Sequence, residues 1–360
     1  MNLPHSYWSW RTLPSGALTK PGIAGYPHLE PAQELLLKTI EGLAGAGHAL
    51  DLSARGGAVA LQLQANGWTV SASDDSAASL AALHKLGLSD GGGACELVCL
   101  MLNAERGNAR VQAQIALAWS RTAVGGVLLL AGDKDKGFER YSKQARQLFG
   151  EGEIVQRGNG YRVAKLVKTK LEPPVTPLAQ RFTFSARGLT VECSAQPGVF
   201  AAGKLDAASA VMLTHLPNAA GKRVLDIGAG YGALGVTLAL QGATVTMLES
   251  DAPSVQSCVD TLALNQQTGT VLHSDVDASL SAKTHFDWVV MNPPFHVGRD
   301  LKLEVALEFI AAAGRRVKFG GQLWLVANHF LPYEPALASL GVLEVVTVER
   351  GFKLLRVTRD

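Results

Sequence analysis

Short apolar runs alternate with longer amphipathic stretches along most of the chain. In the C-terminal half, the apolar run over residues 223–227 is followed by a glycine-rich turn, a predicted helix over residues 233–240 and a second apolar run over residues 243–249. Apolar strands that alternate with helices predict a mostly parallel sheet that is covered on both faces. The pattern therefore predicts an α/β fold.

Further apolar runs supply the other predicted strands. Gly351 and only a few other residues separate the last two runs. Because parallel neighbours need a long crossover, so short a connection predicts an antiparallel C-terminal hairpin. The further strands are predicted at residues 287–291, 322–327, 344–348 and 352–358 in the C-terminal half, and at residues 49–52, 68–74, 97–102, 127–130 and 162–167 in the N-terminal half.

The N-terminal half repeats the strand, turn, helix and strand of the C-terminal half, with its helix predicted over residues 58–65. Three prolines within residues 169–178 predict a linker between the halves, because proline removes a backbone donor and favours extended chain. We therefore expect a duplicated α/β domain, over residues 1–172 and 179–360. Five pairs of positions match at one constant offset, namely Asp51 with Asp226, Gly57 with Gly232, Gly67 with Gly242, Val70 with Val245, and Asp74 with Glu249.

Composition and charge add four expectations. A chain of 360 residues exceeds the size at which one hydrophobic core stops growing, which agrees with two domains. The formal net charge is only +2, but basic residues outnumber acidic ones in residues 134–170, which either hold phosphates or form a solvated face. The sequence shows no secretory signal and no apolar run of about 20 residues, so we expect a cytoplasmic protein that does not enter a membrane. The four cysteines have the spacing of neither a disulfide framework nor a zinc site, and we expect buried thiols and no metal.

The residues Asp226, Gly228, Gly230 and Gly232 form D-x-G-x-G-x-G between a predicted strand and a predicted helix. Glycines permit positive φ and a close approach of the backbone to a ligand. A glycine-rich turn alone fits a pyrophosphate equally well, as in nicotinamide or flavin enzymes. The carboxylate of Asp226 favours another ligand, because it would repel a pyrophosphate but can accept hydrogen bonds from an ammonium group.

Two further acidic residues follow predicted strands. Glu249 ends the second strand, where it can bind both hydroxyls of a ribose, a sugar that NAD and S-adenosylmethionine share. Asp275 follows the third strand, and its position suits an acceptor for an adenine amino group with Val276 nearby. The alternative for Asp275 is an ordinary surface carboxylate.

The segment Asn292, Pro293, Pro294 and Phe295 directly follows the apolar run at residues 287–291. Two successive prolines must end the strand at the edge of the sheet where ligands bind. The exocyclic amino group of a base is a poor nucleophile, because its lone pair is delocalised into the ring. If the Asn292 side-chain oxygen and the Pro293 carbonyl accept its two N–H groups, they favour a tetrahedral nitrogen, and Phe295 can stack on the base.

With these motifs, the chain resembles the small-subunit ribosomal RNA guanine-N2 methyltransferase C family and its close relative that acts on the large subunit. The resemblance implies two tandem class I methyltransferase domains, which are Rossmann-like with an antiparallel C-terminal hairpin. It also implies a monomer that transfers a methyl group from S-adenosylmethionine to the N2 amino group of a guanine, in small-subunit (16S) ribosomal RNA or the small ribosomal subunit. Further similar segments lie, in the family's order, at residues 198–200, 205–206, 292–296, 326–333 and 352–353.

The resemblance assigns the residues of the site. Lys204, Arg299 and Lys353 are candidates for contacts with phosphate or are solvated charges. The catalytic residues implied are Asn292, Pro293, Pro294 and Phe295, and the cofactor-binding residues implied are Phe200, Asp206, Asp226, Gly228, Ala229, Gly230, Gly232, Glu249, Ser250, Asp275, Val276 and Asn292.

The N-terminal half resembles the family's N-terminal domain, a decayed copy of the catalytic fold. Arg55 stands in the place of Gly230, Ser53 stands in the place of Gly228, and residues 102–104 lack paired prolines. We therefore expect that this half binds no cofactor and instead helps to hold RNA or stabilises the catalytic half.

Three other functions remain open from the residues alone. A protein glutamine N5-methyltransferase uses a similar motif to present an amide, but such enzymes resemble N-P-P-Y, and the phenylalanine favours a base. A nicotinamide-dependent oxidoreductase shares the strand, glycine turn and helix. A non-catalytic RNA-binding factor is disfavoured by the intact glycines and the intact Asn292–Phe295 segment.

Overall fold

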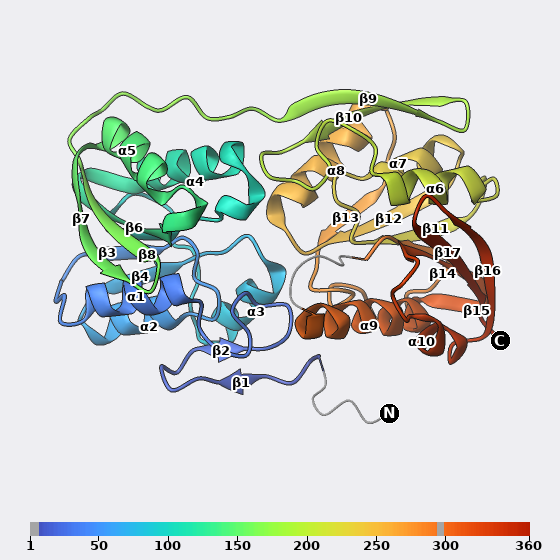
Figure 1. The fold of residues 1–360 in the computed structure, drawn as a ribbon, viewed down its shortest axis with the longest axis horizontal. Helices are drawn as coiled ribbons and strands as arrows, with labels where there is room; N and C mark the ends of the chain where they lie inside the picture. Colours follow the sequence, from blue (N-terminus) through green and yellow to red (C-terminus); the bar gives the residue numbers. More distant parts are fainter. Residues whose placement is uncertain (1–6, 294–298) are drawn as a thin grey trace. The chain divides into compact units, whose positions relative to one another are not determined.

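Two large sheets organise the chain, one in each half (Figure 1). The computed structural model describes residues 7–293 and 299–360. Within it the chain divides into two compact units, residues 1–178 and residues 179–360. The linker segment at residues 171–179 carries neither helix nor strand.

The C-terminal unit contains a seven-stranded sheet in the order β13-β12-β11-β14-β15-β17-β16. The first five strands in this order run parallel, and β17 is antiparallel to both of its neighbours. The predicted fold class and the predicted C-terminal hairpin are confirmed. The strands are β11 (Arg223–Ile227), β12 (Thr244–Glu249), β13 (Thr270–His273), β14 (Phe286–Met291), β15 (Val317–Asn328), β16 (Val342–Glu349) and β17 (Phe352–Thr358).

Helices cover this sheet, and an antiparallel hairpin of β9 (Gln180–Ala186) and β10 (Leu189–Ala195) packs on α7 and α8. Because the sheet lies on one side of α7 and β10 on the other, residues 233–239 of this helix are all buried. The helices are α6 (Ala207–His215), α7 (Ala233–Leu240), α8 (Ala252–Leu264), α9 (Arg299–Arg316) and α10 (Glu334–Ala338).

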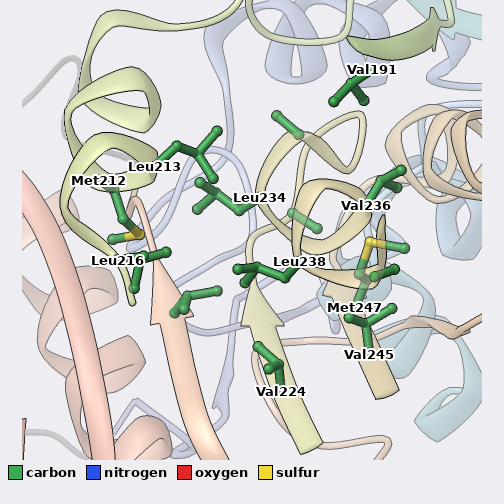
Figure 2. Packing of buried hydrophobic residues seen from close by; sticks show 14 of the residues in the cluster. Val191, Met212, Leu213, Leu216, Val224, Leu234, Val236, Leu238, Val245 and Met247 are labelled. Carbon is green, nitrogen blue, oxygen red and sulfur yellow. The ribbon is translucent and has the colours of Figure 1, made fainter. Parts of the chain in front are cut away.

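One apolar cluster packs β11, α7 and the β9–β10 hairpin against one another. Val224 of β11, Leu234 of α7 and Met247 of β12 are buried in it, and Met212 of α6 and Val191 of β10 join from either side (Figure 2). Each such side chain contributes about 1.5–3 kcal/mol when fully buried. The cluster therefore fixes the place where β11 turns into α7, which is the glycine-rich segment.

The N-terminal unit contains a six-stranded sheet in the order β4-β3-β5-β6-β8-β7. This order equals that of the C-terminal sheet without a counterpart of β13 among the described residues. Both sheets also shift register in their last hairpin, between Ile154 and Gln156 in β7 and between Val345 and Thr347 in β16. The strands are β3 (His48–Asp51), β4 (Thr69–Ala72), β5 (Cys95–Met101), β6 (Thr122–Asp133), β7 (Gly150–Gly158) and β8 (Tyr161–Lys168).

Five helices and a small hairpin complete the N-terminal unit. The hairpin precedes the sheet in the chain, and short 3-10 turns directly precede α4 and α5. These elements are β1 (Arg11–Thr12), β2 (Leu18–Thr19), α1 (Pro31–Ile40), α2 (Ala58–Ala65), α3 (Ala77–Lys85), η1 (Ala104–Arg106), α4 (Asn108–Arg121), η2 (Lys134–Lys136) and α5 (Phe138–Phe149).

Two of the strands that the sequence analysis missed share one property. β7 alternates between half-buried and exposed residues, and so does β9. An edge strand or a covering hairpin buries one face at most, so it lacks the continuous apolar run by which the other strands were predicted. The four cysteines are free and buried, as expected. In the described part of the chain, no helix combines the length and the apolar character that crossing a bilayer requires.

Candidate active site

Two features favour glycine in the turn between β11 and α7, namely the backbone conformation and the packing. Gly228, Gly230 and Gly232 have φ of 77°, 62° and 89°, a region that side chains with a Cβ rarely adopt. A Cβ on Gly228 would lie 3.0 Å from the Phe309 ring, so packing also excludes one there. A Cβ on Gly230 would meet no heavy atom within 4 Å. Open space therefore lies beside Gly230.

Asp226 is the second-last residue of β11, just before this turn, and is 1% exposed. Its Oδ2 accepts the N–H of Gly235 at 2.9 Å, whereas its Oδ1 is buried without a hydrogen-bond partner among the described residues. Burial raises the pKa of this carboxyl to about 7, and the nearby Glu249 carboxylate acts in the same direction. Such an oxygen is an acceptor that a bound ligand can satisfy.

Glu249 ends the neighbouring strand β12 and fastens the glycine turn. Its Oε2 accepts the N–H of Gly230 at 2.8 Å, and its Oε1 accepts the N–H of Ser250 at 2.8 Å. Burial raises the pKa of Glu249 to about 7. The backbone of Asp251 is a third hydrogen-bond donor to this carboxylate. A carboxylate has about four acceptor positions, so one remains for a ligand hydroxyl.

The turn after β13 brings a third acidic residue to the same edge of the sheet. Asp275 is 6% exposed, and Val276 beside it is buried with φ of 50°. Burial alone would raise the pKa of the next residue, Asp277, but its ion pairs with Arg315 at 2.8 Å and Arg316 at 2.6 Å lower it. The C-terminal end of α9 therefore anchors the turn that carries Asp275.

Asn292 leaves β14 with its amide held on one side only. Its Nδ2 donates to Asp206 Oδ2 at 2.8 Å and to Ser209 Oγ at 3.2 Å. Its Oδ1 is buried and has no hydrogen-bond partner among the described residues. Pro293 is buried, while Pro294 and Phe295 lie outside the described residues.

The remaining predicted cofactor residues differ in their contacts and in their exposure. Ala229 donates its N–H to the Leu248 carbonyl in the glycine turn, and Ser250 follows Glu249. Phe200 is 58% exposed. Asp206 caps α6, and its contact with Asn292 is one that the sequence analysis missed.

Comparison with known proteins decides the family. A family model described as the methyltransferase small domain matches residues 190–356. A 16S rRNA N2 G1207 methyltransferase from T. Thermophilus, solved in complex with AdoMet and guanosine, is 39% identical with a TM-score of 0.89, and the match covers 99% of both chains. The ribosomal RNA small subunit methyltransferase C of Pseudomonas putida (strain W619) is 31% identical over 82% of this chain and 90% of its own. This chain belongs to the ribosomal RNA small subunit methyltransferase C family.

A second relative of that name agrees. The ribosomal RNA small subunit methyltransferase C of Pseudomonas entomophila (strain L48) is 33% identical over 64% of this chain and 70% of its own length. The chain is therefore a methyltransferase with two domains of the class I fold.

Three basic residues were expected either to contact phosphate or to be solvated, and for Lys353 both expectations are wrong. Lys353 of the methyltransferase is 5% exposed, and its Nζ donates to the Leu331 carbonyl at 2.5 Å and to Glu334. It lies on β17, where the segment that carries Leu331 and Glu334 holds its ammonium group. Lys204 is exposed, and the side chain of Arg299 lies outside the described residues.

In the N-terminal unit of the methyltransferase, an arginine fills the corresponding turn. Arg55 stands in the place of Gly230 and keeps a left-handed backbone with φ of 50°. Its N–H donates to Asp74 Oδ2 at 3.0 Å, and its guanidinium pairs with Asp74 at 3.2 Å and Glu30 at 2.7 Å. The carboxylate that corresponds to Glu249 is thus bound by a side chain of its own unit.

Proposed function

We propose that this methyltransferase transfers the methyl group of S-adenosylmethionine to the exocyclic N2 amino group of a guanine in small-subunit ribosomal RNA. The observation that carries the proposal is the Oδ1 of Asn292, a buried acceptor at the end of β14 that has no hydrogen-bond partner among the described residues. Leaving such a group unsatisfied costs about 1–3 kcal/mol. An amino group that enters the site removes this cost by donating an N–H.

The name of the T. Thermophilus relative supports the choice of substrate. That protein is a 16S rRNA N2 G1207 methyltransferase, and it is 39% identical over 99% of both chains. We extend its substrate to this chain and propose the guanine that corresponds to G1207. On this proposal the protein acts as a monomer in the cytoplasm, where ribosomal subunits assemble.

The residues of the C-terminal unit fit S-adenosylmethionine. The free Oδ1 of Asp226 suits an ammonium group, and the remaining acceptor position of the Glu249 carboxylate suits a ribose hydroxyl. The open space beside Gly230 lets a ligand approach the backbone, and Asp275 with Val276 is proposed for the adenine. When bound, this cofactor supplies a methyl group already activated on a sulfonium.

The protein's own residues then act by orientation and polarisation. Asn292 Oδ1 accepts one N–H of the guanine amino group, and the Pro293 carbonyl is proposed to accept the other. These bonds draw the nitrogen lone pair out of conjugation with the ring and fix its direction. The nitrogen loses its proton after the transfer, so no strong base is required beforehand. Stacking of the base on Phe295 remains part of the proposal.

The N-terminal unit has a different proposed role. Its turn holds Arg55 where a cofactor would need space, and we expect it to bind none. Lys143 and Arg146 are exposed on α5, and no ion-pair partner within 4 Å is recorded for either in the described part of the chain. These cations suit a phosphate backbone, which favours a role in holding RNA.

Methylation of defined substrates tests the proposal. The purified chain is given isotope-labelled S-adenosylmethionine with assembled small subunits, naked 16S rRNA, large subunits or a release-factor peptide. The rRNA and the subunits come from a strain that lacks the enzyme. Mass spectrometry should place the label on N2 of one guanine of 16S rRNA, and Asn292→Ala should lower kcat by about 10²- to 10³-fold with little change in cofactor affinity.

Other results of the same experiment would contradict the proposal. Label on a glutamine of the peptide, or on large-subunit RNA alone, would replace the proposed substrate. Unchanged turnover of Asn292→Ala would remove that residue from the mechanism.

A further inference from the structure

The amide of Asn292 contacts a small polar cluster formed by Asp206 and Ser209, and the predicted role of Asp206 in cofactor binding does not account for these contacts. Asp206 Oδ2 accepts three hydrogen bonds, from the Ser209 N–H at 3.0 Å, the Ser209 hydroxyl at 3.3 Å and the Asn292 amide at 2.8 Å. The Ser209 oxygen lies 3.2 Å from the same amide nitrogen. Both N–H groups of Asn292 therefore have an acceptor.

We infer that Asp206 and Ser209 are positioning residues that orient the amide of Asn292 and leave its Oδ1 free for the substrate amine. This inference rests on the proposed function only in taking Asn292 as the residue that receives an amine. It gives Asp206 a task other than covering the cofactor.

The chemistry of a carboxylate determines which way the amide faces. An ionised carboxylate only accepts hydrogen bonds. If the Asn292 amide rotated by 180°, its oxygen would meet Asp206 Oδ2, and two acceptors would face each other with no proton between them. The nitrogen must therefore face Asp206, and the oxygen must face away.

Ser209 reinforces the same direction. Its hydroxyl has one proton, which it donates to Asp206, so the lone pairs of its oxygen remain for the Asn292 nitrogen. The backbone holds this arrangement in place, because Asp206 caps α6 and Ser209 lies in the first turn of that helix. Asp206 and Ser209 both act as hydrogen-bond acceptors toward the Asn292 amide and thus orient it.

The cluster also makes Asn292 Oδ1 a stronger acceptor. A hydrogen bond from an amide N–H to a carboxylate draws electron density toward the amide oxygen, and linked hydrogen bonds strengthen one another by about 10–30% each. A more negative oxygen binds the N–H of an amine more tightly as positive charge develops on its nitrogen. Asp206 therefore acts on the reaction through Asn292 without touching the substrate.

A matched pair of variants tests the inference. Asp251 caps α8 and binds Ser254 N–H at 3.2 Å and the Ser254 hydroxyl at 2.9 Å, as Asp206 does with Ser209, but no bond from Asp251 to Asn292 is recorded. We expect Asp206→Asn to lower kcat about 10-fold, because an amide at 206 tolerates both orientations of Asn292. Asp251→Asn removes an equivalent capping charge and should leave kcat unchanged.

A double-mutant cycle separates positioning from a general structural effect. In the Asn292→Ala background, Asp206→Asn should change kcat by less than about 2-fold, because the residue through which it acts is gone. The dissociation constant of S-adenosylhomocysteine should be the same for Asp206→Asn and the parent chain. The assay uses whichever substrate the parent chain methylates, so a result that moves the substrate to another RNA or to a peptide leaves the inference intact.

Two results would overturn it. One is an equal loss of kcat from Asp206→Asn with and without the Asn292 side chain. The other is a kcat that stays at the parent level while the dissociation constant of S-adenosylhomocysteine rises, which would return Asp206 to the cofactor site.

Discussion

The turns that carry Arg55 and Gly230 in the two units of this methyltransferase have similar backbone conformations but different side chains. Arg55 and Gly230 have φ of 50° and 62°, and both donate their N–H to the acidic residue that follows the next strand. Arg55 then adds a guanidinium that binds this acidic residue, Asp74, whereas Gly230 leaves open space beside Glu249. The path of the chain therefore tolerates a side chain at this position. What glycine provides at 230 is room.

A second difference lies at the edge of the sheet. The C-terminal sheet ends in β13, and the turn after this strand carries Asp275. The described N-terminal sheet ends in β4, so it offers no equivalent turn. The N-terminal unit differs from the C-terminal one at two of the three places where a nucleoside ligand would be held.

The strongest test of this comparison is to place the arginine of the N-terminal turn at position 230. Gly230→Arg should lower the affinity for S-adenosylhomocysteine by about 10³-fold, close to 4 kcal/mol, because the guanidinium would fill the open space and pair with Glu249. The midpoint of unfolding should fall only by the few degrees that a side chain on this left-handed backbone costs, about 1–2 kcal/mol, since Arg55 already adopts the same conformation. Calorimetry and thermal denaturation measure the two quantities.

Gly230→Ala is the matched control for that variant. Its Cβ would meet no heavy atom within 4 Å, so only the left-handed backbone costs energy, about 1–2 kcal/mol. Binding within 10-fold of the parent chain is expected. If alanine abolished binding as completely as arginine, backbone strain would explain the effect, and the comparison of the turns would fail.

Removing the arginine from the N-terminal turn should weaken that unit instead. Asp74 has a side chain that is only 2% exposed, and Arg55→Ala leaves this charge without its partner. Breaking a buried pair in this way costs about 3–5 kcal/mol. Hydrogen exchange over residues 48–74 should become faster, and the chain should still bind one equivalent of S-adenosylhomocysteine. A second equivalent would contradict the expected inertness of the N-terminal unit.

The sequence predicts most of the fold, since local patterns determine it. The apolar runs at residues 223–227 and 352–358 coincide with β11 and β17, because the glycine turn ends one and Gly351 begins the other. The expected strand at 322–327 is longer in the structure, where β15 spans Val317–Asn328. Its first five residues, VKFGG, contain a lysine and two glycines, so they do not form the continuous apolar run from which a strand was predicted. Strands with one exposed face, such as β7, carry too few apolar residues to be recognised in this way.

The candidate site was only partly predictable. The glycines and Asp226 form a local motif, and the structure places them in one turn. Asp206 and Asn292 are 86 residues apart, and no local pattern links a helix cap to the end of a strand. Lys353 carries a charge that suggests an exposed residue, but its ammonium is held by Leu331 and Glu334, which are 22 and 19 residues away in the chain. Both features depend on contacts between residues far apart in the chain, which no single segment of the sequence reveals.

Glu249→Gln should have a smaller effect on binding. A glutamine keeps the shape but accepts from hydroxyls with one oxygen only, so affinity for S-adenosylhomocysteine should fall about 10-fold. Because the pKa of Glu249 is raised to about 7, the parent carboxyl is protonated below that pH and accepts less well. Parent affinity should therefore rise between pH 6 and pH 8. The variant should show a shallower rise, because only Asp226 still titrates in this range; an identical pH profile would exclude Glu249 as the titrating ligand.

The buried aspartates Asp51 and Asp226 give the smallest effect and compare the two units directly. Burial raises the pKa of each from 3.8 to about 7, so the folded chain binds more protons than the unfolded chain between these values. Stability should therefore fall as the pH rises from about 4 to about 7. Asp51→Asn and Asp226→Asn should each flatten this dependence in their own unit, with a gain of about 1 kcal/mol at pH 8. Hydrogen exchange over α2 and α7 at pH 5 and pH 8 measures it. Only Asp226→Asn should also weaken S-adenosylhomocysteine binding, and weaker binding in Asp51→Asn would show that the N-terminal carboxylate serves a ligand after all.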